Sequence, residues 1–162
     1  LPEDQIYREL SLEVLDELEE KLYENKEEGL HSCVVMDDIG SQLKSRGAKC
    51  EKKLVQMLQN RRHVACSYIT LLQKFKDCPN GIRSNTSHLA FFRPRNRIEK
   101  EAVMHELMPY DNKKNEQIFA HIFDNEKMKF PFMFIDMSLK KSNKYLFYSG
   151  FNPLMIDEET PP

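Results

Sequence analysis

The stretch Cys33-Val34-Val35-Met36-Asp37-Asp38 decides the fold, because four apolar residues are closed by two adjacent carboxylates. It predicts a buried strand over residues 30–36 with the acids at its carboxyl end. Ligands of open α/β sheets bind outside the carboxyl ends of the strands. One carboxylate can hold a hydrated Mg²⁺ there while its neighbour takes a proton from an attacking water. A turn or a helix cap is the simpler interpretation of such acids.

A second apolar run, residues 64–72, has the composition of a buried strand and ends at Gln73. The uncharged amide of Gln73 can donate to a phosphate oxygen and orient a water. If the two strands are parallel neighbours, Asp37, Asp38 and Gln73 converge on one γ-phosphate. The alternative is that Gln73 only solvates a strand end.

Helical periodicity and turn residues divide the rest of the chain into further helices and strands. Helices are expected at 6–28, 48–59, 98–107 and 116–123, and further strands at 87–92, 130–135 and 145–148. Loops are expected at 40–47 and 79–81, and a flexible tail at 154–162. Alternating strands and helices predict an α/β fold with a mostly parallel sheet flanked by helices. The length of 162 residues predicts a single domain over 1–162.

The net charge of -2 hides a segregation along the chain. Residues 1–38 carry 3 basic and 13 acidic side chains, whereas residues 39–100 carry 14 basic and 3 acidic ones. A basic middle third favours a polyanionic partner, unless acidic and basic faces only neutralise each other. The four cysteines show no metal-ligand spacing, which argues against a structural zinc, and no apolar run reaches the roughly 20 residues of a membrane helix.

Four segments, in this order, resemble the FtsK-HerA-type viral genome-packaging ATPases, in the poxvirus-like branch of large double-stranded DNA viruses. They are Val34-Val35-Met36-Asp37-Asp38, Asn60-Arg61-Arg62-His63, Ile69-Thr70-Leu71-Leu72-Gln73 and Pro79-Asn80-Gly81-Ile82-Arg83-Ser84-Asn85. The resemblance covers about residues 30 to 95 and is weaker in the helices beyond. It implies a RecA-like P-loop fold, ATP hydrolysis with Mg²⁺, a homo-oligomeric ring and translocation of viral double-stranded DNA. It also implies capsid or portal-type partners, in the virion or the host-cell cytoplasm.

The same resemblance assigns roles to individual residues. Asp37 matches the magnesium-binding Walker B carboxylate, Asp38 the carboxylate that activates water, and Gln73 the polar sensor. Arg83 matches an arginine that reaches the nucleotide of a neighbouring subunit, with Arg62 as the second choice. A guanidinium offers planar, permanently charged donors to a transferring phosphoryl group. The alternative for either arginine is a surface or DNA-facing charge.

One expected motif is missing, since G-x-x-x-x-G-K-[ST] occurs nowhere in the chain and its five glycines are scattered. The chain also begins at Leu1 rather than Met. We therefore expect the carboxyl-terminal portion of a longer ATPase, without the P-loop unit that precedes it in the family. These 162 residues alone should bind ATP poorly and hydrolyse little of it.

A basic turn, Arg93-Pro94-Arg95-Asn96-Arg97, supplies candidate DNA contacts through Arg93, Arg95 and Arg97. Further basic residues that could line the same path are Lys44, Arg46, Lys49, Lys52 and Lys53. Positive charge that contacts only backbone phosphates suits a motor that does not read sequence. The turn could equally form a subunit contact.

Two rival functions remain open. A non-catalytic α/β module could keep the fold and bind only DNA or protein. A metal-dependent nuclease could use Asp37, Gln73 and a nearby lysine, but Phe75 occupies the position where such a site needs the lysine, between Lys74 and Lys76.

Overall fold

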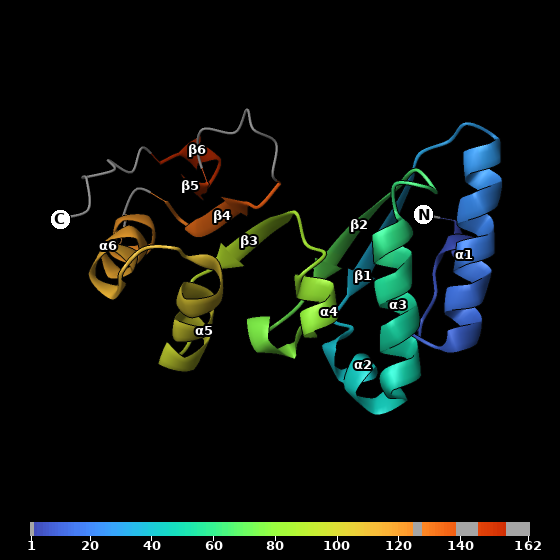
Figure 1. Ribbon diagram of the computed structural model, residues 1–162, viewed down its shortest axis with the longest axis horizontal. Helices are drawn as coiled ribbons and strands as arrows, with labels where there is room; N and C mark the ends of the chain where they lie inside the picture. The colour runs from blue at the N-terminus through green and yellow to red at the C-terminus, as the bar shows by residue number, and fades with distance from the viewer. Residues whose placement is uncertain (1, 125–127, 139–145, 155–162) are drawn as a thin grey trace. The chain divides into compact units, whose positions relative to one another are not determined.

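The computed structural model describes residues 2–124, 128–138 and 146–154, which fall into two compact units (Figure 1). The amino-terminal unit covers residues 1–85 and the carboxyl-terminal unit residues 86–162. The single domain expected over 1–162 stays a prediction. In the described part of the chain, no helix is both long and apolar enough to cross a membrane.

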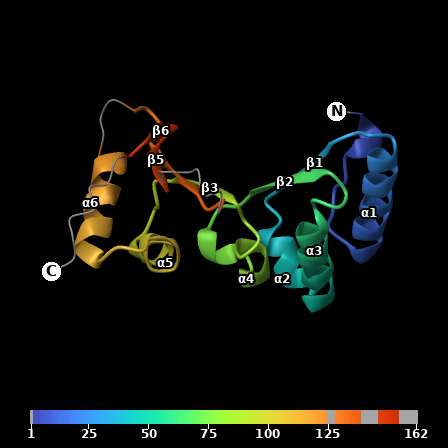
Figure 2. The same ribbon diagram turned by 45° about the horizontal axis from the view of Figure 1, so that its top comes forward.

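The amino-terminal unit is built on two parallel strands with helices between and around them. Its elements are η1 (Glu3–Gln5), α1 (Leu12–Glu27), β1 (Ser32–Asp37), α2 (Gly40–Arg46), α3 (Ala48–Asn60), β2 (Cys66–Leu71), η2 (Phe75–Asp77) and α4 (Asn80–Arg83). Strands β1 and β2 pair from Ser32 opposite Cys66 to Asp37 opposite Leu71, and Figure 2 shows them side by side. The carboxyl ends of both strands therefore meet at one edge.

Helices α1 and α3 pack together and supply six of the fourteen buried residues in the core of this unit. Helix α1 begins after Ser11, whose Oγ accepts a hydrogen bond from the Val14 amide at 3.2 Å. The buried residues of α3 are Cys50, Leu54, Met57 and Leu58. These four residues are the face that helical spacing predicts, so this helix and its orientation are confirmed.

An ion-pair cluster ties α3 to α1. The Lys53 Nζ lies 2.6 Å from Asp16 Oδ1 and 2.7 Å from Glu19 Oε2. Hydrogen bonds to these two carboxylates raise the pKa of Lys53. Because the Lys53 side chain is only 21% exposed, solvent screens its pair with Glu19 less than it screens an ordinary surface pair.

Replacing Lys53 with Gln should lower the free energy of unfolding by about 1 kcal/mol at neutral pH. A raised folded-state pKa stabilises the fold at all pH values below the ordinary lysine pKa of 10.5, and this contribution fades as pH rises through the folded-state value. Urea unfolding at pH 7 and at strongly alkaline pH measures both effects. The neighbouring exposed Lys52, changed to Gln, is the matched control, and an equal loss in both variants would contradict the prediction.

The strands of this unit are half-buried, whereas the sequence predicts fully buried ones. Burial alternates along them, and the residues that face away from the core form the open face of the parallel pair. The apolar residues of the open face are Cys33, Val35, Ile69 and Leu71. Val35 is 58% exposed and Ile69 49% exposed. An apolar run shows that a strand suits burial, but it does not show that both faces are covered.

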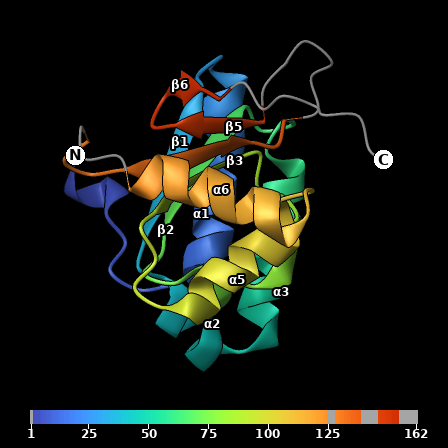
Figure 3. The ribbon, with the colours of Figure 1, turned by 90° about the vertical axis from the view of Figure 1, so that its left-hand side faces the viewer.

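The carboxyl-terminal unit is a four-stranded antiparallel sheet with two helices. Its elements are β3 (His88–Phe92), α5 (Arg97–Leu107), α6 (Asn112–Phe123), β4 (Phe132–Asp136), β5 (Phe147–Ser149) and β6 (Asn152–Pro153), and the strand order is β3-β4-β5-β6. Helix α6 lies against β4 (Figure 3). Met133, Ile135 and Phe147 are fully buried. Asn96 and Asp111 cap α5 and α6 by accepting amide hydrogen bonds.

The α/β class is confirmed, but the mostly parallel sheet is wrong for the described residues. Only β1 and β2 pair in parallel there, while β3 to β6 pair antiparallel. The parallel prediction rested on the alternation of strands and helices, but β3 and β4 pair antiparallel although α5 and α6 lie between them in the chain. Helices between two strands therefore do not by themselves make the pair parallel.

Two expected loops are short helices instead. Residues 40–46 form α2, where buried Leu43 follows buried Ile39 by one helical turn. Residues 80–83 form α4, because Pro79 precedes a helix here instead of ending one. The expected tail lies outside the described residues from 155 onward.

Candidate functional site

The residues that the sequence predicts as a site lie at the carboxyl ends of β1 and β2 and directly after them. The Asp38 amide donates to the Leu71 carbonyl oxygen at 3.0 Å, which extends the strand pairing by one residue. Asp38 has a φ of 49°, in the left-handed region that Asp tolerates better than most residues. The chain therefore turns sharply at Asp38, directly after the strand.

The structure brings Asp38 and Gln73 together. The Gln73 Nε2 donates a hydrogen bond of 2.8 Å to Asp38 Oδ2. Asp37 is the preceding residue, at the last paired position of β1, and all three side chains are accessible. The arrangement presents two carboxylates and one amide at a single sheet edge, with Asp38 oriented by Gln73.

A feature beside this edge is not foreseen in the sequence. The Lys44 ammonium of α2 pairs with Asp77, and this hydrogen bond lowers the pKa of the Asp77 carboxyl. Gly40 lets α2 approach closely, because a Cβ there would lie 3.2 Å from the Asp77 Cβ. Gly40, two residues after Asp38, was the available signal for this packing.

The two candidate trans-acting arginines lie in different surroundings. The Arg83 guanidinium donates to the Cys78 carbonyl oxygen at 2.5 Å and to the Asn80 side chain, and lies 5.0 Å from the Phe75 ring centroid. These three contacts are with its own segment. Arg62 is exposed in the turn before β2. Reaching another subunit would require Arg83 to exchange these local acceptors.

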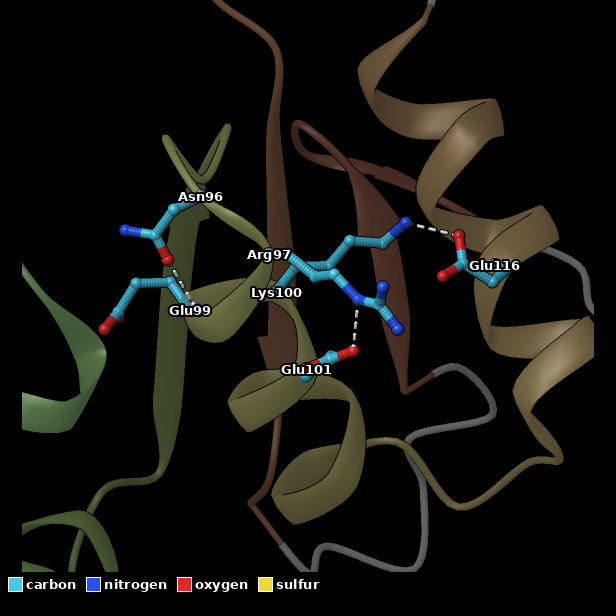
Figure 4. A network of polar contacts seen from close by, with 6 residues as sticks. All are labelled: Asn96, Arg97, Glu99, Lys100, Glu101 and Glu116. Atoms are coloured by element: carbon cyan, nitrogen blue, oxygen red, sulfur yellow. Dashed lines mark hydrogen bonds and ion pairs between the residues drawn. The ribbon is translucent and has the colours of Figure 1, made fainter.

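The predicted DNA-binding arginines lie at the surface of the carboxyl-terminal unit. Arg93 pairs with Asp124 at 3.5 Å, and Arg97 pairs with Glu101 at 2.6 Å. Figure 4 shows the latter pair beside the Lys100–Glu116 pair, which joins α5 to α6. Arg95 is exposed. Since exposed pairs are weak, phosphates can compete for Arg93 and Arg97.

The residues of this site could hold Mg²⁺ only together with waters and nucleotide phosphates as further ligands. Among residues 2–124, 128–138 and 146–154, no three His, Cys, Asp or Glu side chains gather to hold a metal. Mg²⁺ commonly binds through one or two carboxylates together with waters and substrate phosphates. The accessible Asp37 carboxylate suits that role, whereas these residues include no phosphate cradle.

Comparison with known proteins gives one family and two related folds. The family model described as "Poxvirus A32 protein" matches residues 7–148. The structure resembles B204, the DNA-packaging ATPase of Sulfolobus turreted icosahedral virus, with a TM-score of 0.59 and 16% identity over 81% of this chain and 59% of that one. It also resembles the genome packaging NTPase B204 of Sulfolobus turreted icosahedral virus 2, in complex with ATP-gammaS, with a TM-score of 0.58 and 13% identity over 82% of this chain and 60% of that one.

No curated protein matches the chain. At these identities the two solved structures establish a shared fold. The chain spans about 60% of the length of each of them.

Proposed function

Because this chain belongs to the poxvirus A32 protein family, we propose that it is the carboxyl-terminal part of an ATPase that packages viral double-stranded DNA. The observation that carries the proposal is the 2.8 Å hydrogen bond between Gln73 and Asp38 at the shared edge of two parallel strands. That edge is where α/β sheets bind their ligands. A carboxylate held there by a neutral amide is suited to activating water.

Two observations support a longer protein. The solved structures of similar fold are longer, and this chain spans about 60% of them. The sequence also has no G-x-x-x-x-G-K-[ST] motif. We propose that a preceding part of the protein supplies the phosphate cradle and completes a RecA-like core around β1 and β2.

In the proposed reaction, Asp38 is the general base. Its carboxylate takes a proton from the water that attacks the γ-phosphate. Gln73 fixes the carboxylate through Oδ2 and can donate to a phosphate oxygen when that bond opens. Asp37 would hold Mg²⁺, which neutralises charge on the phosphates when it is bound.

The remaining roles follow from the same proposal. Arg83 would act on the nucleotide of a neighbouring subunit in a homo-oligomeric ring. Arg93, Arg95 and Arg97 would contact the phosphates of double-stranded DNA. The ring would meet a capsid or portal-type protein, in the virion or the host-cell cytoplasm.

Replacing Gln73 with Leu in the longer protein should lower kcat for ATP hydrolysis by about 100-fold, because the carboxylate loses its orienting donor. The KM for ATP should change little, since Gln73 acts mainly after binding. Steady-state phosphate release with Mg²⁺ measures both. Gln59→Leu, at an exposed position of α3, is the matched control. Unchanged turnover in Gln73→Leu would remove the support for this site.

A second candidate is a non-catalytic α/β module that binds DNA or protein. The missing phosphate-cradle motif favours it. It differs from the first in one measurable respect, since it predicts no Mg²⁺-dependent ATP hydrolysis even by the longer protein.

A further inference from the structure

The antiparallel sheet of the carboxyl-terminal unit has one face made of aromatic rings. This aromatic face consists of His88, Phe92, Phe132, Phe134, Tyr148 and Phe151. Residues between them in β4 and β5, such as Met133 and Phe147, point into the core instead. The aromatic face is thus the side of the sheet that the core of this unit does not cover.

The rings form a continuous track across the strands. Phe92 lies opposite Phe132 in the register, and their centroids are 5.6 Å apart. Phe134 lies opposite Tyr148 at 5.7 Å. The Phe151 ring centroid lies 5.2 Å from that of Phe132 and 5.7 Å from that of Phe134, so Phe151 links the two pairs. Phe92 is 61% exposed and Phe151 is 75% exposed, so ring surface remains available at one end of the track and at the ring that links the two pairs.

A cavity with positive charge adjoins one end of this track. Its volume is about 470 Å³, and its lining includes Phe92, Phe130, Arg93 and Lys129. Phe130 is 71% exposed, and the Lys129 ammonium lies 5.4 Å from its ring centroid. The size falls within the usual range for small-ligand sites, about 300–1,000 Å³. Two accessible rings, those of Phe92 and Phe130, and two cationic side chains therefore line the same cavity.

We infer that the aromatic face and this cavity bind an unpaired nucleic-acid strand. Bases stack on aromatic side chains irrespective of sequence, while cations beside them neutralise the backbone. Asp124, which also lines the cavity, holds Arg93 only through an exposed pair, and a phosphate can replace it. The bases of a duplex are already stacked, so the rings should favour a single strand over a duplex.

This surface is distinct from the strand-end site of the amino-terminal unit. It needs neither ATP nor Mg²⁺, so its test is independent of the proposed hydrolysis. The competing occupant is a second copy of the chain, which would bury the same rings by self-association.

The test uses the 162-residue chain and a short fluorescein-labelled oligothymidylate, with fluorescence anisotropy at about 0.1 M salt. Single-stranded DNA should bind more tightly than the matched oligothymidylate–oligoadenylate duplex. Phe92→Ala should weaken single-strand binding about tenfold through the loss of one stacking ring. Lys129→Gln should reduce the salt dependence of binding by about one counterion.

Ile98→Ala is the control, because Ile98 is as exposed as Phe92, at 61%, but lies on α5 and does not line the cavity. It should bind like the parent, and thermal melting should show that each variant is folded. Equal binding of single strand and duplex, or equal affinity of the Phe92→Ala and Ile98→Ala variants, overturns the inference. The inference is also overturned if sedimentation shows that Phe92→Ala abolishes self-association while single-strand binding is unchanged. That result would assign the aromatic face to a second copy of the chain.

Discussion

Replacing Asp38 with Asn in the longer protein should lower kcat for ATP hydrolysis by about 10²–10⁴-fold. The substitution preserves shape, and the Asn side-chain oxygen can still accept the hydrogen bond from Gln73 Nε2, which is 2.8 Å in the parent. The neutral amide cannot take a proton from water. The variant should therefore still bind ATP, which a fluorescent ATP analogue measures separately from turnover.

Two further substitutions separate the roles of the carboxylates. Asp37→Asn should raise the Mg²⁺ concentration needed for half-maximal turnover, because Asp37 is the proposed metal ligand. Asp4→Asn, at an exposed position before α1, should leave both quantities unchanged. If Asp38→Asn keeps parental turnover, Asp38 is not the base and the proposed mechanism fails.

Replacing Phe147 with Ala should lower the free energy of unfolding of the carboxyl-terminal unit by about 3–5 kcal/mol. Phe147 is fully buried on β5, opposite Ile135, and its ring centroid lies 6.2 Å from that of Tyr110. Truncation removes a large apolar surface from the core and leaves a cavity that the sheet cannot close. Urea unfolding followed by circular dichroism measures the loss.

Phe130→Ala is the matched control for this prediction. Phe130 is 71% exposed, so its removal should change stability by no more than about 0.5 kcal/mol. Similar losses in both variants would show that Phe147 does not occupy a core position.

The spacing of apolar residues along the sequence correctly predicted the buried face of helix α3. The buried face of α3 follows from residues three and four apart, and its members Leu54 and Met57 are each 1% exposed. The meeting of Asp38 and Gln73 was predictable for a similar reason, because each follows an apolar run and parallel strands end at one edge. Their catalytic roles stay predictions.

The pairing of distant segments and the exact path of the chain could not be predicted from the sequence. Nothing in the apolar runs shows that β3 and β4 pair antiparallel, or that Val35 and Ile69 on the open face are exposed, since both depend on which elements meet. The contacts of Arg83 with Cys78 and Phe75 require the local chain path. The Arg97–Glu101 pair was also missed, because the expected helix begins at residue 98 whereas α5 begins at Arg97, which puts the two side chains four residues apart on one helix.

The open face of the parallel pair has a practical consequence for labelling. Cys33 is its exposed thiol, whereas Cys50, Cys66 and Cys78 are buried. A maleimide dye should therefore react with Cys33 far faster than with the other three thiols. Such a dye would report directly on strand β1, five residues from Asp38, and any polypeptide that settles over this face would slow the coupling or change the emission.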